Sequence, residues 1–224
     1  MENQLKIKNL ILSLGGDLVG FCKHDIEVIK GQNLPYAITI AVKLPDAILK
    51  TITDKPTISY FHSYRTANAL LDQIAFRVSS EVEKLGYSAY PIAASQSTAD
   101  DKTSYRAVYS HKAFARLSGL GFIGKSGLFI TKKYGSKVRF ATVLTDMPLK
   151  AECPPIANGC GACNNCVNAC PAGAISGIIY QNGMMREDFF SAEKCSNYMK
   201  TFKDIGRGSV CGICLSVCPY NKLK

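Results

Sequence analysis

Residues 160–171 read CGACNNCVNACP and place four cysteines, Cys160, Cys163, Cys166 and Cys170, within eleven residues, with a proline directly after the last. Gaps of two, two and three residues separate the thiols, and this is the spacing that holds [4Fe–4S] clusters in bacterial proteins. Ligands three residues apart wrap three corners of a cubane cluster, so the fourth cysteine points away from it. In proteins with two clusters that fourth thiol binds the other one. The run therefore predicts further ligands elsewhere in the chain.

A second set of cysteines is present near the end of the chain. The stretch CGICLSVCP at 211–219 repeats the last three ligands, and EKCSNYM offers Cys195 as a fourth. Pseudo-twofold exchange of one ligand then predicts two complete sets: Cys160, Cys163, Cys166 and Cys218 for one cluster, and Cys195, Cys211, Cys214 and Cys170 for the other. A pair of zinc sites is the alternative, but zinc prefers two separated C-x2-C pairs. Two cysteines are not needed as ligands. Cys22 is expected to be a small buried apolar side chain, and Cys153 is expected to take no part in binding a cluster.

The cysteines also divide the chain, because only Cys22 lies in the first 150 residues. We therefore expect a domain of residues 1–150, followed by a cluster-binding domain of residues 151–224. Ten cysteines in a cytosolic protein are typical of metal ligands and not of disulfides. The N-terminus has no basic region or cleavage site of a signal peptide, and no apolar run is long enough to span a bilayer. These features favour a cytoplasmic protein without membrane association.

The net charge of +10 is concentrated in the first domain, where residues 1–150 carry 20 Lys and Arg against 12 Asp and Glu. Such a balance suits an anionic substrate or cofactor, nucleic acid or an acidic redox partner. A solvated surface with an excess of lysine explains the charge equally well, because no run of Lys and Arg exceeds two residues.

Hydrophobic periodicity predicts helices at residues 3–14, 59–85 and 110–117, and strands at 17–22, 36–44 and 88–93. LFIT (128–131) and VRFATVLT (138–145) are expected to form a hairpin around a turn at 134–136. A Gly-rich loop precedes that hairpin, and the polar segment 94–104 is long enough to line a site. Irregular alternation of helices and strands favours an α+β or α/β domain with helices on at least one face of a sheet.

Five stretches occur in the order found in a known family: HKAFARLSGLGFIGKSGLFI, VLTDMPL, CGACNNCVNACPAGAI, EKCSNYM and CGICLSVCPYN. From about residue 33 onward the chain resembles the epoxyqueuosine reductase family, which is related to the reductive dehalogenases. The resemblance implies a nitroreductase-like α+β domain followed by a bacterial two-cluster ferredoxin-like domain. It also implies a cobalamin or other corrinoid enclosed between them, which the clusters reduce, and a general acid that supplies a proton.

The chain departs from the family's pattern in two places. It ends six residues after Cys218, which implies a short form without the helical repeats that help the family to hold tRNA. About 14 residues before Gly119, where the family has a catalytic aspartate, this chain has Tyr105. Reductive dehalogenases resemble this pattern in using a tyrosine as proton donor, so the resemblance implies a catalytic Tyr105. The alternative is a tyrosine at a pocket edge or in the core. His111 is the second candidate for a catalytic role.

The glycine-rich stretch GLGFIGK follows a helix and not a strand, and its spacing fits neither the Walker pattern nor the dinucleotide fingerprint. Gly121 and Gly124 instead indicate close approach of the backbone to a large flat cofactor. From the resemblance, Lys125, Ser126 and Thr131 are candidate contacts to amide or phosphate groups of a corrinoid.

The sequence supports three functional hypotheses. The first is an iron–sulfur reductase with a bound corrinoid, which takes electrons from an external donor such as flavodoxin or ferredoxin and reduces a small molecule. The second is an electron-transfer module that supplies a separate corrinoid or flavin protein, and the missing aspartate favours it. The third is a truncated tRNA epoxyqueuosine reductase, which the basic N-terminal domain favours and the missing repeats oppose.

Overall fold

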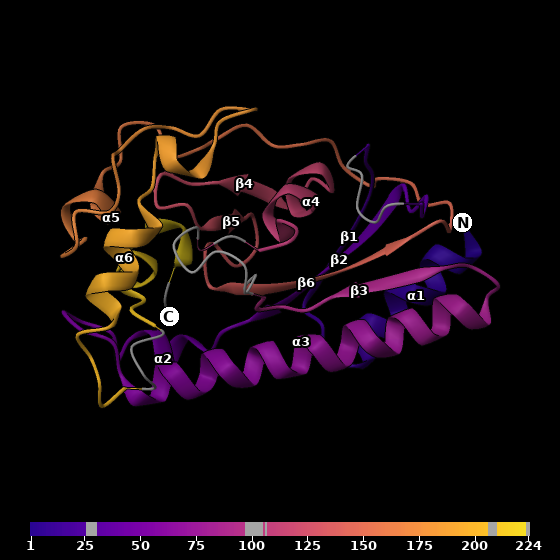
Figure 1. Ribbon diagram of the computed structural model, residues 1–224, viewed down its shortest axis with the longest axis horizontal. Coiled ribbons are helices and arrows are strands. Elements are labelled where there is room, and N and C mark those ends of the chain that lie inside the picture. The colour runs from indigo at the N-terminus through magenta and orange to yellow at the C-terminus, as the bar shows by residue number, and fades with distance from the viewer. Residues whose placement is uncertain (26–30, 97–104, 106, 206–209, 223–224) are drawn as a thin grey trace.

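The computed structural model describes residues 1–25, 31–96, 105, 107–205 and 210–222. A sheet lies between the long helix α3 (Ile58–Lys84) on one face and α4 (His111–Leu117) on the other (Figure 1). The cysteine-rich segment lies at the end of the sheet where α3 begins. The predicted α+β class is therefore confirmed.

The remaining elements follow the predicted order. The other helices of the first part are α1 (Glu2–Ser13) and α2 (Asp46–Leu49). The strands are β1 (Leu18–Lys23), β2 (Tyr36–Lys43), β3 (Ala89–Ile92), β4 (Gly121–Ile123), β5 (Phe129–Thr131) and β6 (Val138–Thr145). The cysteine-rich segment holds α5 (Asn165–Asn168), α6 (Ala192–Met199), α7 (Ile213–Ser216) and the 3-10 turns η1 (Arg186–Asp188) and η3 (Pro219–Asn221). The three helices and three strands predicted up to residue 117 all form, with ends shifted by a residue or two.

Four strands form the main sheet in the order β1-β2-β6-β3, and all neighbours are antiparallel. Successive side chains of a strand face opposite sides. On β6, Ala141 and Val143 pack in the core beneath α3, whereas Phe140 and Leu144 pack beneath α4. Both faces of the sheet are therefore buried.

The hairpin predicted between residues 128–131 and 138–145 is wrong. β5 pairs with β4 in a separate two-stranded sheet, and β6 lies between β2 and β3. β2 pairs with β6 over its whole length, and β3 pairs only with Thr142–Thr145. β5 pairs with neither of these strands nor with β6, and instead joins the stretch that the sequence suggested was a loop. Gly121 permits this pairing, since a Cβ there would collide with the carbonyl of Ile130.

Helix α3 begins at Thr57, whose hydroxyl accepts a hydrogen bond from the backbone N–H of Tyr60 over 3.2 Å. Such a cap satisfies one of the free N–H groups of the first turn. The buried residues then recur at helical spacing and form one apolar face against the sheet. They are Ala67, Leu71, Ile74, Ala75, Val78 and Val82.

Helix α4 is fixed to the opposite face of the sheet by the buried Phe114 and by His111. Nδ1 of His111 lies 2.9 Å from Oγ1 of Thr142, and Nε2 lies 2.9 Å from the carbonyl oxygen of Ala93. Because a carbonyl only accepts, Nε2 carries the proton and Nδ1 accepts from the threonine hydroxyl. The neutral imidazole therefore uses both nitrogens to join α4 to the sheet.

The cysteine-rich segment packs into the same core as the sheet. Ile213 and Leu215 of α7 belong to the cluster that includes Ile52 and Tyr60. Gly212, just before α7, has a φ of 84°, and a Cβ there would lie 2.8 Å from the side chains of Ile52 and Tyr60. Only glycine allows both the left-handed turn and this close contact.

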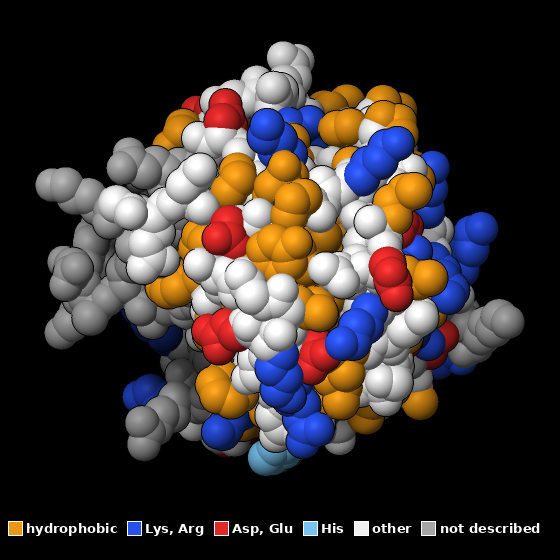
Figure 2. Space-filling model, turned by 90° about the vertical axis from the view of Figure 1, so that its right-hand side faces the viewer, with side chains coloured by type: hydrophobic (Ala, Val, Ile, Leu, Met, Phe, Trp, Pro, Cys, Tyr) orange, Lys and Arg blue, Asp and Glu red, His pale blue; other side chains and the backbone are white. Residues whose placement is uncertain are grey.

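Part of the excess positive charge is compensated locally. Lys6 pairs with Glu81 and Lys8 pairs with Glu152, each over 2.7 Å. On the face drawn in Figure 2, Lys and Arg side chains are interspersed with Asp and Glu around hydrophobic side chains. Among the described residues, no helix is both long and apolar enough to cross a membrane.

The position of His111 predicts a pH dependence of stability. Burial lowers the pKa of His111 from 6.5 to about 4. As the pH falls, the unfolded chain therefore binds the proton first, and stability present above pH 6.5 is lost toward pH 4. Because the unfolded chain takes up this proton, we expect His111 to lower the free energy of unfolding by at most about 2 kcal/mol between pH 7 and pH 5. Denaturant titrations of His111→Gln, which cannot titrate, should show a smaller loss than those of the wild type.

His62→Gln, which removes an exposed histidine of α3, is the matched control for loss of an imidazole. Equal losses of stability in His111→Gln and wild type from pH 7 to pH 5 would show that His111 is not held neutral.

Candidate metal centre and adjoining cavity

The two cysteine runs lie against each other at one end of the sheet. α5, which carries Cys166, packs on α7, which carries Cys214. Cys195 comes from α6, whose first turn is capped by the hydroxyl of Ser191. Short helices from distant parts of the chain therefore lie together, and α5 and α6 are seen at the same end of the fold in Figure 1.

A small cavity is lined by the thiols of a first group, Cys160, Cys163, Cys166 and Cys218, and also by Cys214. Burial raises the pKa of Cys166, and the thiols of Cys160, Cys218 and Cys163 raise it further. Burial likewise raises the pKa of Cys218, with smaller contributions from Cys160 and Cys163. Such mutual effects require short separations. The four thiols of the first group are those that the spacing assigns to one cluster.

The remaining thiols of the two runs form a second group. Burial raises the pKa of Cys195 to about 11, and the thiols of Cys211 and Cys170 add to the shift. Burial also raises the pKa of Cys214, and the thiols of Cys195 and Cys211 raise it further. Cys170 therefore lies with the second group, although it belongs to the first run in sequence. Cys22, which is buried in β1, and the exposed Cys153 are not among the thiols that shift either group.

Lys125 places a buried ammonium group beside the first group of thiols. Only 5% of the residue is exposed. Its Nζ donates to the carbonyl oxygen of Cys163 over 3.0 Å and to Oδ1 of Asn164 over 2.9 Å. Among the described residues no carboxylate pairs with it. A buried cation needs negative charge nearby, and thiolates bound to iron supply it. The donor set and its surroundings therefore fit an iron–sulfur cluster.

A larger cavity of about 600 Å³ adjoins the other side of the β4–β5 hairpin. Ile123, Leu128 and Phe129 of this segment line the larger cavity, whereas Lys125 and Ile130 line the cavity with the thiols. One hairpin is therefore a wall shared by the two sites.

Three cations line the larger cavity: Lys112, Arg139 and Arg186. The carboxylate of Glu187 also lines it and pairs with Arg186 over 2.7 Å. Nζ of Lys112 donates to the carbonyl oxygen of Gly127 over 2.7 Å. Burial lowers the pKa of Lys112 to about 8, and the charges of Arg139 and Arg186 lower it further. A cavity with this balance favours an anionic ligand.

Sequence reasoning missed these three cations, because none belongs to a recognisable motif. A signal was available for Arg139, which is the one charged residue in the buried strand VRFATVLT. Its Nε donates to Oδ1 of Asn68 over 3.0 Å, and its guanidinium lies 4.3 Å from the centre of the Tyr64 ring. α3 therefore holds this arginine at the cavity wall.

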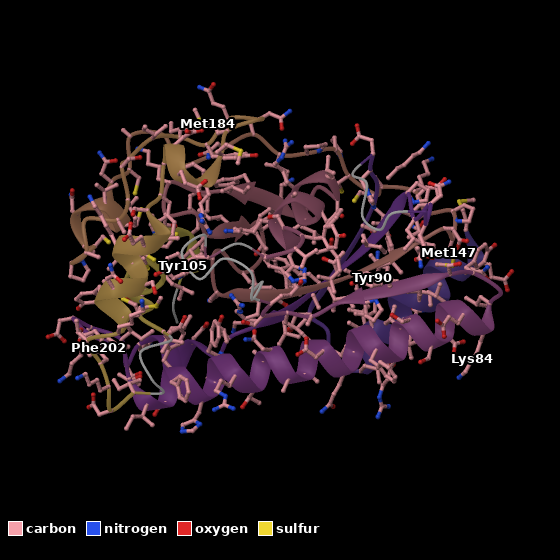
Figure 3. The ribbon with its side chains drawn as sticks, viewed as in Figure 1. Lys84, Tyr90, Tyr105, Met147, Met184 and Phe202 are labelled. Carbon is pink, nitrogen blue, oxygen red and sulfur yellow. The ribbon has the colours of Figure 1, made fainter. Side chains whose placement is uncertain are left out.

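Tyr105 lies at the wall of the larger cavity, beside α6 (Figure 3). Its φ of 48° is in the left-handed region, which is uncommon for a residue with a side chain. Its carbonyl accepts from Nη1 of Arg186 over 2.6 Å, and its hydroxyl lies 3.5 Å from Nζ of Lys200. Hydrogen bonds with Ser196 and then Lys200 lower the pKa of the phenol. These neighbours stabilise a tyrosinate, so the residue can release a proton.

His111, the other predicted catalytic residue, also lines the larger cavity. Both of its ring nitrogens are hydrogen-bonded within the protein, and its pKa is lowered to about 4 by burial. These two hydrogen bonds join α4 to the sheet. The catalytic role of His111 stays a prediction.

The five residues predicted to contact a corrinoid do not line the larger cavity. Lys125 and Ser126 line the cavity with the thiols instead. Oγ1 of Thr131 donates to the carbonyl oxygen of Gly135 over 3.1 Å and closes the turn after β5.

The two glycines of this set approach protein atoms and not open space. Gly121 lies against Ile130, and a Cβ at Gly124 would lie 2.6 Å from the Ile130 side chain and 3.4 Å from Sγ of Cys160. The close approach inferred from these glycines is real, but the partners are the second strand of the hairpin and a cysteine.

Comparison with known families supports the assignment of the thiols. Residues 159–221 match the 4Fe-4S double cluster binding domain. The chain is 36% identical over 122 residues to an epoxyqueuosine reductase of Lactococcus garvieae, which covers 49% of this chain and 31% of that protein. It is 29% identical over 167 residues to a tetrachloroethene reductive dehalogenase of Desulfitobacterium hafniense, covering 68% and 27%. The chain spans about a third of the length of these curated relatives.

Two solved structures share the fold. One is a reductive dehalogenase whose structure suggests a mechanism for B12-dependent dehalogenation. The match covers 96% of this chain and 31% of the dehalogenase chain, with a TM-score of 0.73 and 23% identity. The other is epoxyqueuosine reductase with an epoxyqueuosine-modified tRNA-Tyr stem loop, covering 99% and 66%, with a TM-score of 0.64 and 20% identity. The resemblance of this chain to the epoxyqueuosine reductase family and the related reductive dehalogenases is therefore confirmed, in sequence over about half of the chain and in fold over nearly all of it.

Proposed function

We propose that this chain is an iron–sulfur oxidoreductase in which two [4Fe–4S] clusters deliver electrons to a corrinoid in the larger cavity. The observation that carries the proposal is the β4–β5 hairpin, which has the first group of thiols on one side and the cavity on the other. A single polypeptide layer thus separates a redox site from a ligand site. The B12-dependent dehalogenation named for one structural neighbour supports a corrinoid as the ligand.

The proposal gives each part of the chain a role. Residues 1–150 form a nitroreductase-like domain for the corrinoid and the substrate, and residues 151–224 form the ferredoxin-like domain. Cys160, Cys163, Cys166 and Cys218 hold one cluster, and Cys170, Cys195, Cys211 and Cys214 hold the other. Because burial keeps several of these thiols protonated, assembly of the clusters releases protons and is favoured by higher pH.

The lining of the larger cavity suits a flat cofactor with polar arms. Phe129, Phe140 and Phe189 provide an apolar wall, and Lys112 and Arg139 provide donors for amide or phosphate oxygens. A volume of about 600 Å³ is typical of sites for drug-sized molecules, so the cavity holds part of a corrinoid and not the whole cofactor. A corrinoid bound there supplies a reducible cobalt centre.

Tyr105 is the proton donor in this proposal. Release of the phenolic proton leaves a tyrosinate, which the Ser196 hydroxyl and the Lys200 ammonium stabilise. The lowered pKa brings the acid nearer to neutral pH, where proton transfer is most efficient. Arg186 holds the Tyr105 carbonyl and so fixes the backbone that carries the donor.

We infer that the substrate is a small molecule with an anionic group. Among the described residues that line the cavity, Lys112, Arg139 and Arg186 give an excess of positive charge over the carboxylate of Glu187. At pH 7 Lys112 is protonated, because its pKa of about 8 lies above that value. 3-Bromo-4-hydroxybenzoic acid, which is bound to one structural neighbour, is therefore a suitable probe.

Two alternatives have support of their own. The name of the 36% identical relative supports an epoxyqueuosine reductase that acts on tRNA. The Tyr105 position, where the family has an aspartate, supports an electron-transfer module without chemistry of its own. The experiments below distinguish these alternatives from the proposed reductase.

Loss of single cysteines tests the exchange of ligands between the runs. We expect Cys218→Ala and Cys170→Ala each to lose about half of the iron and acid-labile sulfide, because each removes one ligand from a different cluster. Cys153→Ala, the matched control at an exposed cysteine, should keep both clusters. Full iron content in Cys218→Ala, or zinc without sulfide in the wild type, would contradict the ligand sets.

Anaerobic reconstitution with cobalamin tests the corrinoid site. We expect cluster-containing protein to bind one cobalamin per chain and to change its visible absorption. Ala113→Trp should abolish this binding and leave the clusters intact, because Ala113 lines the cavity and an indole would fill it. A wild type that holds both clusters and binds no cobalamin would instead support the electron-transfer module.

Turnover tests Tyr105 as the acid. With cobalamin and a chemical reductant we expect debromination of 3-bromo-4-hydroxybenzoate, and Tyr105→Phe should lower kcat by about 10²-fold or more while cobalt is still reduced. Tyr109→Phe is the matched control, since Tyr109 also lines the cavity but burial raises its pKa. Turnover of an epoxyqueuosine-modified tRNA stem loop, and not of the small anion, would support the tRNA enzyme.

A further inference from the structure

Lys125 is a buried cation that the proposed catalytic cavity does not use. We propose that the fixed positive charge of Lys125 raises the reduction potential of one cluster, the cluster held by Cys160, Cys163, Cys166 and Cys218. The inference rests on the proposed ligand sets and is independent of the corrinoid and the substrate.

The charge of Lys125 is compensated by dipoles alone. The ammonium has three N–H donors, and two of them reach the neutral oxygens of Cys163 and Asn164 at 3.0 and 2.9 Å. The residue is 5% exposed, so water contributes little. Among the described residues no carboxylate pairs with it. The ionisable groups that share its cavity are five cysteines and Tyr220, and no carboxylate is among the described residues that line it.

The backbone holds this lysine at a fixed distance from the thiols. The N–H of Gly124 donates to the carbonyl oxygen of Leu128 over 2.8 Å, and the N–H of Gly127 donates to that of Gly124 over 2.9 Å. These bonds close the turn that carries Lys125. Gly124 also lets the turn approach Sγ of Cys160, which would lie 3.4 Å from a Cβ at this position.

The direction of the effect follows from the charge of the cluster. Reduction adds one electron and breaks no bond, so the reduced cluster carries one more negative charge than the oxidised cluster. A fixed cation at contact distance from a ligand stabilises the reduced form more. Buried charges interact with an effective dielectric constant of roughly 20 and are screened little by salt. Hydrogen bonds and charge near the sulfurs are established determinants of such potentials.

The effect is larger at one cluster, although Cys214 of the second group also lines the cavity of Lys125. Lys125 lines the cavity of the first group, and its hydrogen bonds go to the loop of that group. Three of the four thiols of the second group, Cys170, Cys195 and Cys211, do not line this cavity. Lys125 therefore raises the potential of the cluster next to the hairpin relative to the other, which directs electrons toward the larger cavity.

Redox titration of the cluster-containing protein, followed by electron paramagnetic resonance, tests this inference. We expect Lys125→Gln to lower the equilibrium constant for reduction of one cluster at least about tenfold, or roughly 59 mV for one electron, and to shift the other cluster less. Asn164→Asp should shift the same cluster in the same direction by threefold or more, because a carboxylate neutralises the ammonium without removing it.

Two variants separate charge from structure. Lys125→Arg keeps the charge and should leave both potentials within threefold of the wild type. Lys132→Gln removes an exposed lysine from the turn after β5 and should shift neither cluster, because solvent screens that charge.

Each outcome of these redox titrations either supports or overturns the inference on Lys125. Unchanged potentials in Lys125→Gln, or a shift in Lys125→Arg as large as in Lys125→Gln, overturn the inference. Should Lys125→Gln fail to assemble its clusters, Asn164→Asp decides, and no shift in that variant overturns it. A wild type without clusters would instead contradict the proposed ligand sets.

Discussion

The rest of the structure depends on a constraint within one short run of cysteines. Four thiols spaced as in CGACNNCVNACP cannot all face one cubane, so the run needs a partner run. The thiols group accordingly, with Cys218 beside Cys166 and Cys170 beside Cys195. α5 and α7 must therefore lie together, and the short helices of this segment cannot form a core alone. They take it from the sheet domain, where α7 packs on Ile52 and Tyr60.

Because the cysteine-rich segment shares that core, the β4–β5 hairpin is held between two sites. Its residues divide between the two sides: Lys125 and Ile130 line the cavity with the thiols, and Ile123 and Phe129 line the larger cavity. A two-stranded sheet with one face on each site gives a short and rigid separation. This arrangement is what makes a reductase more plausible physically than two unconnected binding sites.

The sequence predicted what depends on local spacing. Hydrophobic periodicity located α3 and β2, and cysteine spacing located the ligand groups. It failed where the outcome depends on partners distant in the chain. The pairing of β5 with β4 could not be inferred, because it depends on how strands distant in the chain are arranged in space. The role of His111 was missed for the same reason, since its two partners come from β6 and the end of β3.

The sequence also could not predict which groups Lys125 and Lys112 would contact. These two lysines place positive charge beside the β4–β5 hairpin. Lys125 bonds the carbonyl of Cys163 on the side of the thiols, and Lys112 bonds the carbonyl of Gly127 on the side of the larger cavity. Neither has a carboxylate partner among the described residues. Burying the Lys125 ammonium without a counter-ion is costly, and the half-buried Lys112 bears part of such a cost. In the proposed reductase, thiolates on iron would supply negative charge beside Lys125, and an anionic ligand would supply it beside Lys112. A wall with positive charge on both faces lowers the energy of an added electron on either side, which suits the transfer of electrons across it.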